Sequence, residues 1–172
     1  MSQTFPTTKE NLKAAFEELR KNLPLLELGE REINGCKMNH FVNAPKSSRE
    51  MYDLVQMLHG DFPFVHEDGN ELNLSEVLSK AKSLANTLHK NGIKANDFVG
   101  ISMQNCTEWI IAYLGITGLG ATCVPFNSWW KENELSYGIE HSECKVIFVD
   151  KKRYEYVKAV SYTHLRAHET LE

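Results

Sequence analysis

Apolar residues in the second half of this chain of 172 residues fall into short runs that alternate with helix-like stretches. The runs are rich in β-branched and aromatic residues, which favour strands, and they cover Phe98–Met103, Thr122–Pro125 and Val146–Val149. Between them the spacing predicts one helix from near Asn105, with Asn105 and Glu108 at N-cap and N3, and another over 132–141. This alternation predicts an α/β fold with three parallel, adjacent strands. We expect Val99, Ile101, Val124, Ile147 and Val149 in its core.

The first half shows helices and hairpins in turn. Thr7 with Glu10 has capping-box spacing before an apolar helical face, and Ser47 with Glu50 offers a second such box. Asn34-Gly35 and Asp68-Gly69 each separate two strand-like runs, and both dipeptides favour hairpin turns with positive φ. The most regular helix is predicted over 75–91, where one stripe comprises Val77, Leu78, Ala81, Leu84, Ala85 and Leu88.

Composition narrows the function classes. Nineteen basic and 23 acidic residues give a net charge of -4, which argues against nucleic acid or an anionic membrane as the main partner. No apolar run reaches the ~20 residues of a transmembrane helix, and the N-terminus lacks the apolar stretch of a secretory signal. We therefore expect a cytoplasmic protein without a transmembrane segment.

Cysteine and histidine spacing gives little support for a metal site or a disulfide. None of the four cysteines lies in a CxxC pair, and Cys123 falls in a predicted buried strand, where a free thiol behaves as a small hydrophobe. His141 and Cys144 would need two further ligands to hold a metal. A helix end followed by a strand start is the favoured interpretation of that pair.

Two further motifs invite a ligand. Gly115, Gly118 and Gly120 precede a strand, whereas a phosphate loop follows a strand and opens a helix. We expect these glycines to let the helix end pack close to the sheet and turn. Trp129 and Trp130 are adjacent and so point in different directions, which predicts one core residue and leaves the other open.

The order of several segments resembles the AMP-forming acyl-CoA synthetases of the adenylate-forming superfamily. The resemblance covers about residues 27–158. It is carried by the order of the segments along the chain, which is specific to this family, and not by any single segment. The matching segments are Asn43-Ala44-Pro45, Ser48-Arg49, Ser75–Leu88, Gly92-Ile93, Asp97, Val99, Asn105, Glu108-Trp109, Gly120-Ala121, Val124-Pro125-Phe126-Asn127, Ser128-Trp129-Trp130 and Glu134-Leu135.

This resemblance implies a fold and a reaction. The fold is the N-terminal part of a wound αβαβα acyl-CoA synthetase-like domain, preceded by β-hairpins and helices. In the reaction, a small-molecule carboxylate attacks ATP to give an acyl-adenylate and pyrophosphate, and the CoA thiol then displaces AMP. ATP, Mg²⁺ and CoA are the implied cofactors. The family's phosphate loop, S-G-T-T-G-x-P-K-G, is absent, so the chain resembles about the first third of such an enzyme.

The missing motifs suggest that the fragment is inactive alone, binds no cofactor tightly and needs the C-terminal remainder of the enzyme as partner. Ligands of wound sheets sit beyond the carboxyl ends of the strands. By resemblance, the loop Phe126, Asn127 and Ser128 would line the CoA nucleotide site, and Lys152 or Arg153 would contact its phosphates. Loop packing with a solvated basic pair is the alternative interpretation. No residue of this chain is predicted to be catalytic.

The domain organisation predicted for the chain has three parts. Residues 1–26 form a helical extension, 27–160 are the incomplete large domain, and 161–172 are a non-native tail. The tail is predicted because Ser161–Thr170 resembles translated sequencing-adaptor read-through, and the helix before it is expected over 150–160. The competing function is a non-catalytic nucleotide-binding or interaction module of the α/β class.

Overall fold

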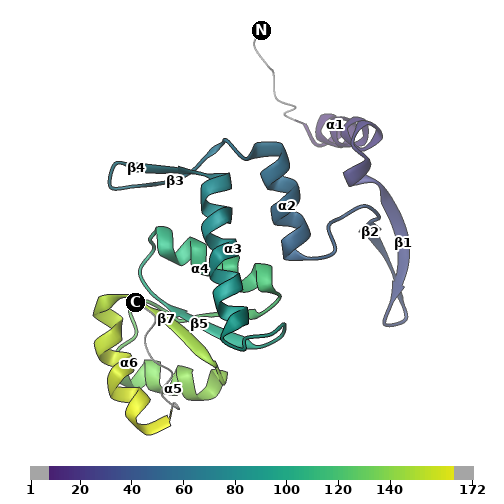
Figure 1. Cartoon of the computed structure of the whole chain (residues 1–172). Helices are drawn as coiled ribbons and strands as arrows, with labels where there is room; N and C mark the ends of the chain where they lie inside the picture. Colours follow the sequence, from purple (N-terminus) through teal and green to yellow (C-terminus); the bar gives the residue numbers. More distant parts are fainter. Residues whose placement is uncertain (1–7, 165–172) are drawn as a thin grey trace. The chain divides into compact units, whose positions relative to one another are not determined.

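The computed structural model describes the backbone of residues 8–164 and the side chains of residues 8–158. The chain divides into two compact units, Met1–Lys46 and Ser47–Glu172. Figure 1 follows the elements of each unit along the chain. Within the described residues, no helix is long and apolar enough to cross a membrane.

From residue 8 onward, the first unit contains one helix, one 3-10 turn and one hairpin. Helix α1 (Lys9–Asn22) is capped by Thr8, whose hydroxyl accepts a hydrogen bond from Asn11 N–H at 3.2 Å. The expected cap Thr7 is therefore wrong by one residue, and Thr7 itself lies outside the described residues. The unit continues with η1 (Pro24–Leu26), β1 (Leu28–Ile33) and β2 (Cys36–Phe41).

The predicted hairpin of this unit is confirmed. Strands β1 and β2 pair antiparallel, and Ile33 faces Cys36 at the closed end. Asn34 and Gly35 have φ of 51° and 79°, which a two-residue turn of this kind requires.

The second unit begins with a helix, a hairpin and a long helix. These are α2 (Ser48–His59), β3 (Pro63–Glu67), β4 (Asn70–Asn73) and α3 (Leu74–Lys90). Ser47 caps α2 as predicted, since its hydroxyl accepts from Glu50 N–H at 3.2 Å. Asn73 and Glu76 form a reciprocal capping box at the start of α3. Asp68 and Gly69 turn the hairpin with positive φ, as expected.

The rest of the unit alternates strands and helices. It contains β5 (Phe98–Ser102), α4 (Thr107–Leu119), β6 (Thr122–Pro125), α5 (Glu132–Ser142), β7 (Val146–Val149) and α6 (Lys151–His164). The three strands are parallel in the order β6-β5-β7, so β6 and β7 each pair with β5 and not with each other. The predicted parallel sheet is therefore confirmed, and α6 extends past the expected end at residue 160.

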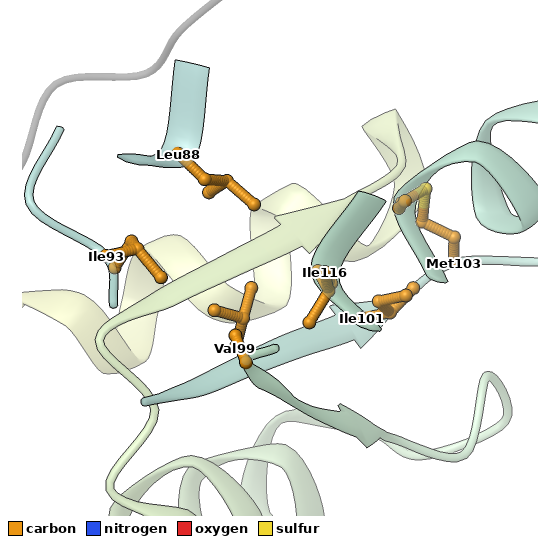
Figure 2. Packing of buried hydrophobic residues seen from close by; sticks show 8 residues of the cluster. Leu88, Ile93, Val99, Ile101, Met103 and Ile116 are labelled. Carbon is orange, nitrogen blue, oxygen red and sulfur yellow. The ribbon is translucent and has the colours of Figure 1, made fainter. Parts of the chain in front are cut away.

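The two faces of the central strand β5 carry different side chains. Val99 and Ile101 point to one face and are fully buried in a core cluster with residues of α3 and α4, which Figure 2 shows. Gly100 points to the other face, where an added Cβ would lie 2.6 Å from the ring of Phe126. There a second cluster joins the sheet to α5 and α6, and it comprises Phe126, Leu135, Ile139, Cys144 and Val157.

Of the five predicted core residues, Val99 and Ile101 are fully buried, and the three residues of the outer strands lie at the margin of the core. Val124, Ile147 and Val149 pack against the second cluster but are only half-buried. Among the described residues, each belongs to a strand with a single neighbour in the sheet, so the other edge of that strand is not covered by a strand there. Leu135 and Ile139 of α5 face inward as predicted.

The glycines of α4 approach other helices, which corrects the expected contact with the sheet. An added Cβ on Gly115 would lie 2.9 Å from the carbonyl oxygen of Ala81 in α3. An added Cβ on Gly118 would lie 3.6 Å from the ring of Tyr52 in α2. Gly120 ends the helix with φ of 87°, so the predicted turn is present.

The start of α4 also differs from prediction. The N-cap is Cys106, which makes no side-chain capping bond, and not Asn105. Instead, Glu67 at the end of β3 accepts from the N–H and the hydroxyl of Thr107, the first residue of the helix. A carboxylate at a helix N-terminus is favoured by the free N–H groups and the helix dipole.

Candidate functional site

The loop that follows β6 is held by hydrogen bonds and ring packing within the loop itself. Asn127 Oδ1 accepts from Trp129 N–H at 2.9 Å, and the Asn127 carbonyl accepts from Trp130 N–H at 3.1 Å. Phe126 is buried, and its ring lies 6.3 Å from the ring of Trp130. Trp129 is 83% exposed. This confirms that one tryptophan belongs to the core, and it presents the other at the carboxyl end of the sheet.

Asp150 joins the ends of the other two strands. It lies directly after β7, and its Oδ1 accepts from Arg153 N–H at 2.9 Å in the first turn of α6. Its Oδ2 accepts from the N–H of Gln104, just beyond β5, at 3.0 Å. One carboxylate thus caps α6 and fixes the chain that leaves the central strand.

Arg153 connects this carboxylate to the loop after β6. Its side chain is 4% exposed, and Nη1 donates to Asp150 Oδ2 at 2.6 Å. Nε donates to the carbonyl oxygen of Ser128 at 2.9 Å, and Nη2 donates to the same oxygen. The segments that follow all three strands therefore meet in one hydrogen-bonded network.

The charge state of Asp150 follows from these contacts. Burial by itself would raise the pKa of the carboxyl. Hydrogen bonds from the N–H groups of Gln104 and Arg153 and from the Arg153 guanidinium outweigh burial and lower the pKa. Asp150 is therefore ionised at neutral pH, and its charge balances that of Arg153.

The predicted site residues separate into three kinds. Phe126 is a core residue, whereas Asn127 and Ser128 hold the loop and Arg153 through hydrogen bonds. Lys152 is exposed and has no hydrogen bond or ion pair within the described part of the chain. Arg153 is buried, and its guanidinium is paired with Asp150 and the Ser128 carbonyl.

Two residues of the network were absent from the predicted site. Gln104 contributes only a backbone N–H, which no side-chain pattern reveals. Asp150 had a detectable signal, because it follows a strand and lies three residues before Arg153, at the spacing of a helix cap and N3.

The two cysteines and the histidine that the sequence singled out, Cys123, Cys144 and His141, are packed against other side chains in the structure. Burial and the neighbouring Cys144 raise the pKa of Cys123 to about 11, so its thiol is protonated at neutral pH. The ring of His141 stacks on Tyr137. Among the described residues, no group of three or more His, Cys, Asp or Glu is arranged to hold a metal ion.

The second unit is a wound α/β fold, and proteins of this class bind ligands beyond the carboxyl ends of their parallel strands. The family model for AMP-binding enzymes matches residues 55–171, more than half of the chain. The chain therefore belongs to the AMP-binding enzyme family. The matched range begins after the hairpin of the first unit and includes most of the segment predicted to be a non-native tail.

Curated relatives include both CoA ligases and synthases. The chain is 37% identical over 86 residues, half of its length, to a medium/long-chain-fatty-acid–CoA/3-oxocholest-4-en-26-oate–CoA ligase of Mycolicibacterium smegmatis, of which it covers 15%. It is 26% identical over 118 residues, 69% of its length, to tyrocidine synthase 1 of Brevibacillus parabrevis, of which it covers 11%. The chain thus spans a small part of the length of these relatives.

Solved structures match the fold. Coronafacic acid ligase from Pectobacterium brasiliense superposes with a TM-score of 0.64 and 25% identity. The match covers 68% of this chain and 23% of that one. It supports the assignment of this chain to the N-terminal part of an adenylate-forming ligase fold.

Proposed function

We propose that this chain is the N-terminal segment of an AMP-forming acid–CoA ligase that acts on a fatty acid or a related carboxylate. The carboxylate and ATP would give an acyl-adenylate and pyrophosphate, and CoA would then give acyl-CoA and AMP. The similarity to a fatty-acid–CoA ligase at 37% identity is the observation that carries the proposal. A structural neighbour, a coronafacic acid ligase, points to the same reaction class.

The segment itself would supply one wall of the CoA nucleotide site. The loop after β6 and the start of α6 lie at the carboxyl edge of the sheet, where ligands of wound sheets bind. Lys152 is an exposed cation suited to a phosphate there, because its ammonium has no partner among the described residues. CoA, when bound, would supply the thiol that accepts the acyl group, while ATP and Mg²⁺ would depend on the remainder of the enzyme.

We place this reaction in the cytoplasm as part of the proposal. The four cysteines lie within the described residues and are all free thiols. Free thiols are typical of proteins in reducing compartments. A test is the redox state of these cysteines in intact cells by alkylation and mass spectrometry.

The function is tested with the whole protein that carries this segment. It would be expressed and supplied with ATP, Mg²⁺, CoA and a panel of fatty and aromatic acids, and acyl-CoA would be measured by mass spectrometry. The expected result is CoA thioester and AMP in equal amounts. Adenylation of amino acids without thioester formation to CoA would overturn the proposal and favour the class of the synthase relatives.

A further inference from the structure

The buried guanidinium of Arg153 uses its donors within the protein. Three of its nitrogen atoms donate to Asp150 Oδ2 or to the Ser128 carbonyl oxygen. A guanidinium offers five N–H donors in a planar fork, and this one is arranged around two internal acceptors instead of facing solvent. Its contacts are those of a residue that shapes a loop.

We propose that Arg153 and Asp150 form a positioning pair that locks the loop of residues 126–131 against the start of α6, and that Arg153 is not a ligand of a phosphate. Asp150 is held from two sides, by Gln104 N–H and by Arg153 N–H, so it presents its carboxylate in one place. Arg153 donates both to this fixed carboxylate and to the Ser128 carbonyl oxygen, so it holds Ser128 in a fixed place relative to Asp150.

The lock determines how the exposed indole of Trp129 is presented. Trp129 lies between two fixed points, because Asn127 Oδ1 accepts its N–H and Arg153 holds the carbonyl of the preceding Ser128. A loop whose polar backbone groups are bound in this way loses little conformational freedom when a ligand docks. The loop is therefore arranged before any ligand arrives.

The adjacent basic residues Lys152 and Arg153 therefore have different surroundings and different proposed roles. Arg153 and Asp150 neutralise each other, while Lys152 stays exposed. That this loop lines a nucleotide site rests on the proposed function. The lock of the loop by Arg153 and Asp150 does not, and it is tested without ligand or activity. Failure of the lock is therefore distinguishable from failure of the proposed function.

The test is hydrogen exchange of single amides in the 172-residue chain. In Arg153→Met, the amides of Trp129 and Trp130 are expected to exchange at least about tenfold faster, the factor that corresponds to a lost hydrogen bond of about 1.4 kcal/mol. The amides of β5 should keep their protection. Lys152→Met is the matched control, since it removes the neighbouring exposed cation, and it should leave both regions unchanged.

Two further variants keep the test decisive if Arg153→Met does not fold. Arg153→Lys keeps the charge but loses the fork, and Asp150→Asn keeps the shape but loses the charge; both should loosen the same loop amides. A double variant of both positions should loosen the loop no more than the stronger single variant, because the residues act together. Unchanged protection of Trp129 and Trp130 in a folded variant, or equal loosening in Lys152→Met, would overturn the lock.

Discussion

The carboxylate of Glu67, at the end of strand β3, accepts a hydrogen bond from the backbone N–H of Thr107 at 2.9 Å and a second from its hydroxyl. This contact ties the β3–β4 hairpin to the first turn of α4, the helix that follows the central strand. The hydrogen bond from the Thr107 hydroxyl and then that from its N–H lower the pKa of Glu67.

The first prediction concerns this cap. A carboxyl whose pKa is lower in the folded state stabilises the protein above its unfolded pKa, about 4.3, and loses that contribution as the pH falls through the folded value. Glu67→Gln should therefore lower the urea midpoint at pH 7, and the difference from the native chain should shrink at pH 3. Glu71→Gln on the same hairpin is the control, because the Glu71 carboxylate is exposed and lies 4.0 Å from the His66 ring without capping a helix. Equal midpoints at pH 7 would disprove the cap.

The second prediction is that alanine at two helical glycines, Gly138 and Gly118, has different effects on stability. Glycine to alanine within a helix ordinarily stabilises by up to about 1 kcal/mol. Gly138 of α5 is an exception, since an added Cβ would lie 2.8 Å from Trp130 and 3.2 Å from Phe126. Gly138→Ala should destabilise by about 1–3 kcal/mol, the range for overpacked cores. Gly118→Ala places its Cβ at 3.6 Å from Tyr52 and should be neutral or stabilising. The same sign for both in chemical denaturation would contradict this packing.

The third prediction is that the chain alone has no ligase activity. Its sequence contains none of the phosphate-loop pattern that the proposed reaction needs to stabilise charge on the transferring group. Pyrophosphate release from ATP in the presence of fatty acids should equal that of a sample without protein. Release that depends on the carboxylate and scales with the concentration of the chain would refute the prediction.

The fourth prediction concerns the segment 161–172. The side chains that anchor α6, Arg153 and Val157, lie before it, and residues 165–172 lie outside the described part of the chain. Deleting 161–172 should change the free energy of unfolding by less than about 0.5 kcal/mol, the range of neutral surface changes. Thermal or urea unfolding of the shortened chain measures this. A larger loss would indicate that the segment is packed, native structure and not an adaptor-like tail.

The fifth prediction concerns apolar surface on the second unit. Met57, Leu58, Phe62 and Phe64 are all exposed along the end of α2 and the start of β3, and β6 and β7 are both edge strands. Surfaces and edges of this kind favour association, so the chain should bind an apolar dye and be marginally stable. Phe62→Ser with Phe64→Ser should reduce dye fluorescence more than Tyr137→Ser, which changes an exposed aromatic residue of α5 outside this surface. A monomer that unfolds cooperatively and binds little dye would contradict this.

Much of the fold was predictable because its signals are local. Asn34-Gly35 and Asp68-Gly69 turn where the sequence places them, since few residues other than glycine and asparagine or aspartate tolerate positive φ. The apolar stripe of α3 follows from helical spacing, and the parallel direction of the three strands follows from the helices that alternate with them. The caps at Thr8 and Cys106 were missed by one residue each, because several adjacent polar residues had acceptable capping spacing.

The site was only partly predictable. The sequence singled out Phe126–Ser128 and Arg153 as neighbours at one edge of the sheet, and the structure brings Ser128 and Arg153 into contact. It did not indicate that Arg153 is buried, because burial depends on where the loop after β6 folds back. Lys152 and Arg153 are adjacent and equally basic in sequence, yet they differ completely in exposure.

The sequence by itself determined the order of helices and strands and both hairpin turns, because these depend on side chains a few positions apart. The alternation of strands and helices then predicted a parallel sheet, because crossover helices join parallel strands. The tertiary structure alone decided that Glu67 caps α4, that Gly115 and Gly138 pack against other side chains or backbone, and that Asp150 and Arg153 join three strand ends. The physical reason is that each of these contacts joins residues from different elements. Their partners are chosen by how the sheet and helices pack, which no local pattern encodes.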